Sequence, residues 1–72
     1  MINTNLLCEN IVAARKKLGL TQSQLAKMLG VSAQAVSKWE RGISCPDISL
    51  LDEIAKALQI SLSALLGIPN NE

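Results

Sequence analysis

Apolar residues recur along the chain at the spacing of amphipathic helices. In the N-terminal part they repeat every three or four positions, so that one face of a predicted helix is formed by Leu7, Ile11, Ala14 and Leu18. A second stripe predicts a helix in the C-terminal half and consists of Ile48, Leu51, Ile54, Ala55 and Leu58. Three shorter helical segments are predicted within residues 21–30, 32–41 and 62–66. The pattern therefore predicts five helices.

Capping residues and glycines place the ends of these helices. The expected N-caps are Thr4 or Asn5, Thr21, Ser32, Asp47 or Ser49, and Ser61. Four of the helices are expected to end at a glycine, in order Gly19, Gly30, Gly42 and Gly67. Gln24, three residues after Thr21, completes a capping box. Residues 42–47 contain Pro46, which cannot continue a helix, so we expect a loop there.

The composition agrees with one small all-α domain. The chain has 72 residues, 49% of them hydrophobic, which suffices for one compact core. Leu and Ala are frequent and favour helices, whereas Trp39 is the sole aromatic residue, which argues against a β-sandwich or barrel. We expect a single domain over residues 1–72, with a compact five-helix core at about 7–67 and a frayed tail at 68–72.

Several chemistries are excluded by the residue types that are missing. Without His, the sequence has no histidine base, no Ser-His-Asp triad and no His-containing zinc site. No pair of titratable groups has a spacing that suggests acid–base work, so we expect no enzymatic activity, no catalytic residue, no metal and no cofactor. Cys8 and Cys45 are distant in the sequence and are expected to be reduced thiols rather than a redox pair.

The sequence contains no signal for a membrane or for export. The longest apolar run, residues 11–14, is far shorter than the ~20 residues that a membrane span needs. The first residues lack the basic start of a signal peptide. We therefore expect a cytoplasmic protein with no membrane partner.

The net charge of +1 is unevenly distributed along the chain. Residues 15–41 contain six basic residues and one acidic residue, whereas residues 42–72 contain one Lys and four acidic residues. A basic middle segment is a weak indication of an anionic partner such as nucleic acid, because most charge runs are simply solvated surfaces.

Residues 22–39 have the pattern of a helix-turn-helix. Gly30 joins two short predicted helices and tolerates the positive φ angle that a tight turn between crossed helices requires. Ala26 is small where the two backbones must approach. The apolar positions that fit this motif are Leu25, Leu29, Val31, Val36 and Trp39. A helical hairpin that merely stops at a glycine is the simpler alternative, but the number of coincident positions favours the motif.

The helix after Ser32 has one wholly polar or small face. At about 100° per residue, an arc of about 140° contains Ala33, Ser37, Arg41, Gln34 and Lys38, while the apolar residues lie on the other side. Amide, hydroxyl and cationic groups can bond base edges and phosphates. An ordinary solvated helix face is the alternative, although such a face usually includes an acidic residue and this arc has none. We interpret the arc as a surface that contacts DNA.

Arg15 and Glu40 lie at the margins of two apolar stripes. Arg15 follows Ala14 on the first helix, and Glu40 borders the stripe of the third helix. Opposite charges at facing margins suggest a partly buried ion pair, with two unrelated surface charges as the alternative.

The sequence resembles the lambda-repressor-like (Cro/cI-type) helix-turn-helix family. The resemblance is carried by Gly19-Leu20-Thr21-Gln22, Leu25-Ala26, Leu29-Gly30-Val31-Ser32 and the run from Gln34 to Gly42. It continues through Pro46-Asp47, Leu51, Ile54-Ala55, Leu58, Ile60-Ser61 and Leu65-Leu66-Gly67. It covers roughly residues 7–67, and the run Ser37-Lys38-Trp39-Glu40-Arg41-Gly42 is highly specific.

The resemblance implies a compact five-helix bundle that binds double-stranded DNA, usually as a dimer, with the helix after Ser32 in the major groove. The implied base-reading positions are Ala33, Gln34, Ser37 and Lys38. Gln22 stands where family members bind a phosphate and buttress the recognition helix. Further expected phosphate contacts at helix ends are Thr21, Ser32 and Arg41. Arg15 and Glu40 match a structural ion pair of the family.

Ala33 departs from the family pattern, because close relatives often have a polar base-reading residue at this position. Here the side chain offers only a methyl contact, for instance to thymine.

The leading hypothesis is a sequence-specific, non-enzymatic transcriptional regulator that acts as a repressor. One alternative is a protein-binding module, such as an antitoxin or adaptor, that uses the same fold. Another is that these residues are the DNA-binding part of a larger regulator. We expect a weak homodimer through a C-terminal apolar surface formed by Leu62, Leu65, Leu66 and Ile68.

Overall fold

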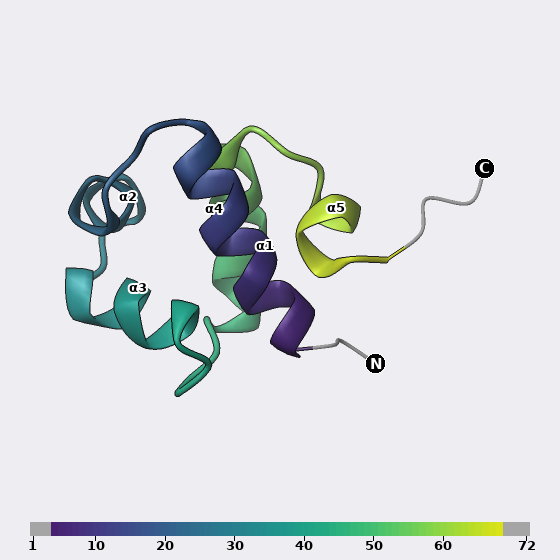
Figure 1. The fold of residues 1–72 in the computed structure, drawn as a ribbon, viewed down its shortest axis with the longest axis horizontal. Coiled ribbons are helices and arrows are strands. Elements are labelled where there is room, and N and C mark those ends of the chain that lie inside the picture. Colours follow the sequence, from purple (N-terminus) through teal and green to yellow (C-terminus); the bar gives the residue numbers. More distant parts are fainter. Residues whose placement is uncertain (1–3, 69–72) are drawn as a thin grey trace.

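The computed structural model describes residues 4–68, which form an all-α bundle with no strand among them (Figure 1). The five α-helices are α1 (Thr4–Lys17), α2 (Gln22–Leu29), α3 (Ala33–Glu40), α4 (Leu51–Leu58) and α5 (Leu62–Leu66), and a short 3-10 helix, η1 (Ile48–Leu50), precedes α4. This confirms the expected fold class. The tail expected to fray lies almost wholly outside the described residues.

The predicted caps of the middle and last helices are confirmed. The Thr21 hydroxyl accepts a hydrogen bond from the Gln24 backbone N–H at 3.0 Å, and the Gln24 side chain accepts one from the Thr21 N–H at 2.8 Å. Ser32 caps α3 and Ser61 caps α5, each through a backbone N–H three residues further on. These bonds satisfy donors that a helix start leaves unpaired, so the sequence fixes where α2, α3 and α5 begin.

Two predicted boundaries differ from the structure. Helix α1 already includes Thr4, so neither Thr4 nor Asn5 is its N-cap. The fourth helix does not start as an α-helix at Ile48. Asp47 caps the 3-10 turn instead, accepting from the Ser49 N–H at 3.2 Å, and α4 begins at Leu51. Ile48 is 78% exposed, so no core contact holds it on the apolar stripe of α4.

One face of every α-helix contributes to a single apolar core. Its fully buried large side chains are Ile11, Val36, Leu25, Ile54, Leu58 and Leu65. In Figure 1, α2 and α3 lie on one side of α1, and α5 lies on the other. Because α3 lies at the edge of the bundle, only its inner face, with Val36 and Trp39, is buried. On its other face, Gln34 and Lys38 are exposed.

Helix α4 ends without a glycine, and this leaves a strained residue. Gln59 caps it in the left-handed conformation with φ 60°, whereas every other positive φ among residues 4–68 belongs to a glycine. A side chain in this conformation costs about 1–2 kcal/mol, which is partly offset because glycine loses more chain entropy on folding.

We therefore expect Gln59→Gly to raise the free energy of unfolding by about 0.5–1 kcal/mol. Gln59→Ala is the matched control, because alanine also carries a Cβ, and it should leave the stability nearly unchanged. Urea unfolding followed by Trp39 fluorescence measures both variants. A glycine variant no more stable than the alanine variant would show that the left-handed cap stores no strain.

Candidate nucleic-acid interface

The turn between α2 and α3 has the geometry predicted for a helix-turn-helix. Gly30 adopts φ 72°, and the N–H of the next residue, Val31, bonds the Ala26 carbonyl at 3.0 Å. Ala26 is buried at this crossing, so its small side chain allows the two helices to pack closely. The turn therefore fixes α3 against α2 and leaves the outer face of α3 uncovered.

The outer face of α3 presents most of the predicted polar arc to solvent. Gln34 and Lys38 are exposed, and Ser37 is half-buried. Ala33 is half-buried as well and packs against the core, so part of its methyl group is already covered. The predicted arc is therefore largely accessible, and its one apolar residue, Ala33, is accessible only in part.

The predicted ion pair between Arg15 and Glu40 is present and is largely shielded from water. Arg15 Nε lies 2.6 Å from Glu40 Oε2, and a second guanidinium nitrogen donates to Glu40 Oε1 at 3.0 Å. The side chains of Arg15 and Glu40 are only 12% and 6% exposed. Such a two-point contact at low exposure joins the end of α3 rigidly to α1.

The structure adds two partners to this pair, Gln22 and the Leu20 carbonyl. The resemblance implied that Gln22 supports the recognition helix, but neither bond was predicted. Gln22 Nε2, at the start of α2, donates to Glu40 Oε1 at 2.9 Å. Arg15 also donates to the Leu20 carbonyl, at 2.7 Å, in the segment that leads into α2. The network of Arg15, Gln22 and Glu40 therefore connects α1, α2 and α3 around one carboxylate. We call it the Glu40 network.

The electrostatics of this network keep Glu40 ionised. Burial raises the pKa of the Glu40 carboxyl, but hydrogen bonds from Arg15 and Gln22, with the charges of Arg15 and Lys16, outweigh burial and lower that pKa overall. The same hydrogen bond to Glu40 raises the pKa of Arg15. The carboxylate thus remains charged at neutral pH and holds the Gln22 amide by one of its two N–H groups, which leaves the other for an anion.

The residues expected to contact phosphate lie at helix ends, with different accessibility. Thr21 and Ser32 are exposed, but their hydroxyl oxygens already accept the capping bonds. Arg41 is exposed, and its one recorded side-chain bond, from Nε to the Ser37 carbonyl, is long at 3.4 Å. Its guanidinium is therefore largely available for a phosphate.

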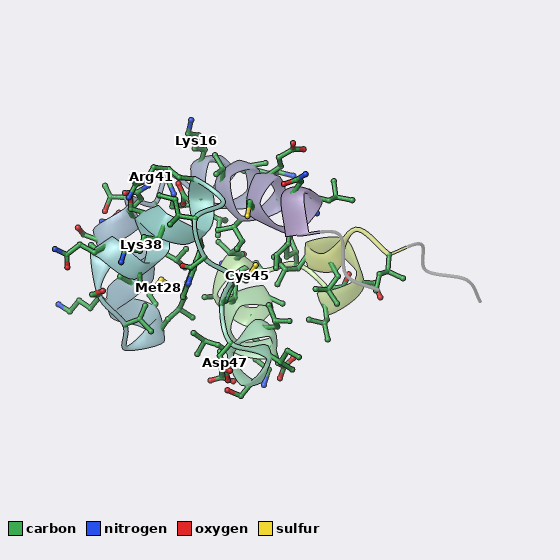
Figure 2. The ribbon with its side chains drawn as sticks, turned by 90° about the horizontal axis from the view of Figure 1, so that it is seen from below. Lys16, Met28, Lys38, Arg41, Cys45 and Asp47 are labelled. Carbon is green, nitrogen blue, oxygen red and sulfur yellow. The ribbon has the colours of Figure 1, made fainter. Side chains whose placement is uncertain are left out.

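Lys16 joins this surface, although the sequence analysis did not select it. Figure 2 shows Lys16, Arg41 and Lys38 following one another along the side of the molecule formed by α1 and α3, with Asp47 at the opposite edge. Lys16 is exposed, and its charge acts on Glu40. Its position directly after Arg15 is the sequence feature that could have identified it as part of this surface. We call Lys16, Gln22, Gln34, Lys38 and Arg41 the polar face.

The expected C-terminal apolar surface is smaller than the sequence suggested. Leu62 and Ile68 are 40% and 48% exposed, and Leu66 is half-buried. Leu65 is fully buried in the core, so its inclusion in that surface was wrong: on a single-turn helix it faces inward. Asn10 fixes this helix by donating to the Ala64 and Leu65 carbonyls at 3.1 and 3.0 Å.

Within residues 4–68, His, Cys, Asp and Glu side chains nowhere gather in a group of three that could hold a metal ion. In the same part of the chain, no helix has the length and apolar character to cross a membrane.

Comparison with known proteins places these features in a family. A family model described as Helix-turn-helix matches residues 11–65. Repressor protein C2 of Salmonella phage P22 is 48% identical over 65 residues, covering 90% of this chain and 30% of that protein. The crystal structure of the P22 c2 repressor with a synthetic operator has a TM-score of 0.78 at 47% identity, covering 83% of this chain and 91% of that one. The chain thus spans less than a third of the whole phage repressor.

Two further similarities show how widely this fold is used. Antitoxin HigA1 of Mycobacterium tuberculosis is 36% identical over 63 residues, covering 88% of this chain and 42% of that protein. Hydroxypropylphosphonic acid epoxidase from S. wedmorenis has a TM-score of 0.80 at 26% identity, over 88% of this chain and 34% of the epoxidase chain. The fold therefore also occurs as one part of an enzyme and does not by itself settle activity.

The Glu40 network predicts a measurable coupling between α1 and α3. Removing one partner leaves a buried charge unpaired, so we expect Glu40→Ala to cost about 2–4 kcal/mol of unfolding free energy. The Arg15→Ala/Glu40→Ala double mutant should recover at least about 1 kcal/mol relative to additivity. Urea unfolding of the four proteins measures this coupling, and additive losses would contradict a direct interaction.

The pH dependence of the same pair has a definite sign. Because the pKa of Glu40 is lowered in the folded state, its carboxylate stabilises the folded protein at pH values above the unfolded-state pKa. This stabilisation is lost as the pH falls below about 5 towards the folded-state pKa. The Glu40→Gln variant, measured alongside, should lack this part of the acid-induced loss.

Proposed function

Because this chain belongs to the helix-turn-helix family, we propose that it binds double-stranded DNA sequence-specifically, without enzymatic activity, and represses transcription. The observation that carries the proposal is the outer surface of α3. It exposes Gln34 and Lys38 with no acidic neighbour in the arc, while the Glu40 network and the turn at Gly30 hold the helix rigidly. A rigid helix whose exposed side is polar suits insertion into the major groove.

On this proposal α3 reads bases. The Gln34 amide offers the paired donor and acceptor that adenine presents in the major groove. Lys38 suits guanine or a phosphate, and Ser37 suits several bases. Ala33 is limited to a methyl contact with its uncovered part, for instance with thymine.

Residues around α3 would position the helix on the DNA backbone. The free N–H of the Gln22 amide and the guanidinium of Arg41 are candidates to bind phosphates on either side of the groove. Lys16 extends this cationic line beyond α3. Thr21 and Ser32 would contribute mainly by capping α2 and α3, whose N-termini would face the DNA backbone on this proposal.

Repression is supported by the P22 repressor, whose name states that role and whose structure contains an operator. The longer relatives fit the possibility that these residues act within a larger regulator. The antitoxin relative favours a second candidate, a module that binds a protein partner. Binding of a random duplex in a gel shift separates the two, because a protein-docking module should retain no duplex.

We expect the chain to bind as a weak dimer. Two helix-turn-helix units related by a dyad read half-sites about 34 Å apart on one face of DNA. The exposed Leu62 and Ile68, with the half-buried Leu66, form the candidate contact near the C-terminus. Because this surface is small, the dimer should form mainly on DNA.

Base reading and phosphate binding are separable by mutation once a specific duplex has been selected in vitro. Gln34→Ala should cost about 1–3 kcal/mol of binding and relax the preference at one base pair. Arg41→Ala and Lys16→Ala should weaken binding to specific and random duplexes alike. Each should reduce the slope of log affinity against log salt concentration by the contribution of about one phosphate contact. Lys56→Ala, which removes a lysine paired with Asp52 on α4, is the charge-matched control.

Titration of each variant with the specific and the random duplex at two salt concentrations gives both the binding affinities and the salt slope. If Gln34→Ala weakens both duplexes equally, Gln34 does not read a base and the proposed orientation of α3 is wrong.

Dimerisation is tested by a charge in the apolar contact. Leu62→Lys should lower the affinity for a duplex with two half-sites about tenfold, with no change for a single half-site. Ala13→Lys adds the same charge to an exposed position of α1 and should have little effect. Analytical ultracentrifugation and footprinting report the stoichiometry, and a 1:1 complex on a non-repeating site would rule the dimer out.

A further inference from the structure

Helix α5 is too short to hold its orientation by itself. It has five residues, and isolated helices shorter than about 12 residues are marginal in water. Leu65 is its one fully buried side chain. The helix packs against α1 and α4, and Figure 1 shows it on the side of α1 opposite to α2 and α3. Its orientation therefore depends on a few contacts with these neighbours.

Asn10 on α1 bonds the last turn of α5 through its side-chain amide. The Asn10 Nδ2 group donates to the Ala64 carbonyl at 3.1 Å and to the Leu65 carbonyl at 3.0 Å. The last carbonyls of a helix lack a full set of partners within the helix, so an amide from another helix can satisfy them. The Ala64 carbonyl also accepts the Gly67 N–H at 3.2 Å. Asn10 is thus bonded to the turn that ends α5.

Gly67 lies directly against the start of α1. It caps α5 in the left-handed conformation, with φ 71°, which favours glycine. A Cβ added to Gly67 would overlap the Leu6 side chain on α1. Gly19 has nearly the same φ, 72°, but a Cβ added there would meet nothing within 4 Å beyond its neighbours in the chain. Gly67 therefore also has a steric role, because it allows α5 to lie close to α1.

The candidate dimer contact and α3 are therefore both fixed to one helix. Leu62 begins α5, and Ile68 follows its cap with its N–H bonded to the Ser63 carbonyl at 2.9 Å, so these exposed side chains move with α5. Asn10 ties α5 to α1, and the Glu40 network ties α3 to the end of α1. A two-fold dimer reads half-sites at one spacing only if the dimer contact is held at a fixed distance from α3.

We propose that α1 sets the half-site spacing and that Asn10 is a positioning residue, which fixes the dimer contact relative to α3. This rests on the proposed function, because the dimer is expected to form on DNA. Asn10 itself is assigned no contact with DNA or with the second copy. It acts through α5, so its loss should affect binding to two half-sites and leave binding to one half-site unchanged.

The test uses duplexes built from the selected half-site, present once or twice. Asn10→Ala removes both bonds to α5 and should lower the affinity for the duplex with two half-sites about fivefold, the net value of about one hydrogen bond. Lengthening the spacer by one base pair should weaken the wild type more than this variant, because a loosened contact tolerates other spacings. Ile11→Val is the control: it removes a core methylene but keeps the Asn10 bonds, and it should retain the wild-type ratio of the two affinities.

Gly67→Ala tests the same attachment from α5. The added Cβ would push α5 away from Leu6, so this variant should behave like Asn10→Ala. Gly19→Ala is its matched control, because it carries the same backbone strain without the overlap. Hydrogen exchange should be faster at the Ile68 amide in both α5 variants and unchanged through α2, which shows that α5 has loosened in a folded protein.

The proposal and the function beneath it fail differently. Unchanged exchange at Ile68 in Asn10→Ala would show that Asn10 does not hold α5. Faster exchange with the wild-type ratio of affinities, or an equal loss on both duplexes, would show that Asn10 does not position the dimer contact. A wild type that binds one half-site as tightly as two would overturn the proposal while DNA binding stands. A wild type that binds no duplex would instead overturn the proposed function.

Discussion

The arrangement of the first three helices depends on one carboxylate. Glu40 at the end of α3 is almost fully removed from water, and a buried charge is tolerated only when it is paired and hydrogen-bonded. Arg15 from α1 and Gln22 from α2 supply those bonds. Because the carboxylate has donors on two sides, α3 cannot rotate about its axis or slide along α2 without leaving a charge unpaired. Its outer face is thereby fixed relative to the start of α2.

This constraint explains why the polar face is a coherent surface. The network that orients α3 also holds the amide of Gln22, so the candidate phosphate contact and the base-reading helix are placed by the same bonds. Lys16 and Arg41 follow the same side, whereas Asp47 lies at the opposite edge. An anionic partner is therefore attracted to the side on which α3 is already aligned.

Local signals in the sequence predicted much of this structure. Thr21, Ser32 and Ser61 act within three residues of themselves, so their capping bonds follow from the sequence alone. The polar arc of α3 follows from helical periodicity, and Arg15–Glu40 from two stripes that had to face each other. The expectation that the base-reading and phosphate contacts bind DNA remains a prediction.

Other features that depend on contacts between residues far apart in the chain were not predicted. The bond from Gln22 to Glu40 joins residues far apart in the chain. No local pattern marks it, although the family resemblance implied that Gln22 supports the recognition helix. Leu65 was assigned to the surface because a single helical turn gives too short a stripe to tell its inner face from its outer one. Ile48 fitted the stripe of α4 by spacing, yet the 3-10 turn begun by Asp47 leaves it exposed.

The central claim is that duplex DNA binds along the line that the Glu40 network sets between the start of α2 and the outside of α3. The most direct measurement is an NMR titration of the isotope-labelled chain with its selected duplex, following backbone and side-chain amides. We expect the largest shifts at the Gln22 and Gln34 side-chain amides and through residues 32–41, with the Arg15 Nε–H signal retained. Shifts concentrated on α5 and η1, with α3 unperturbed, would contradict it.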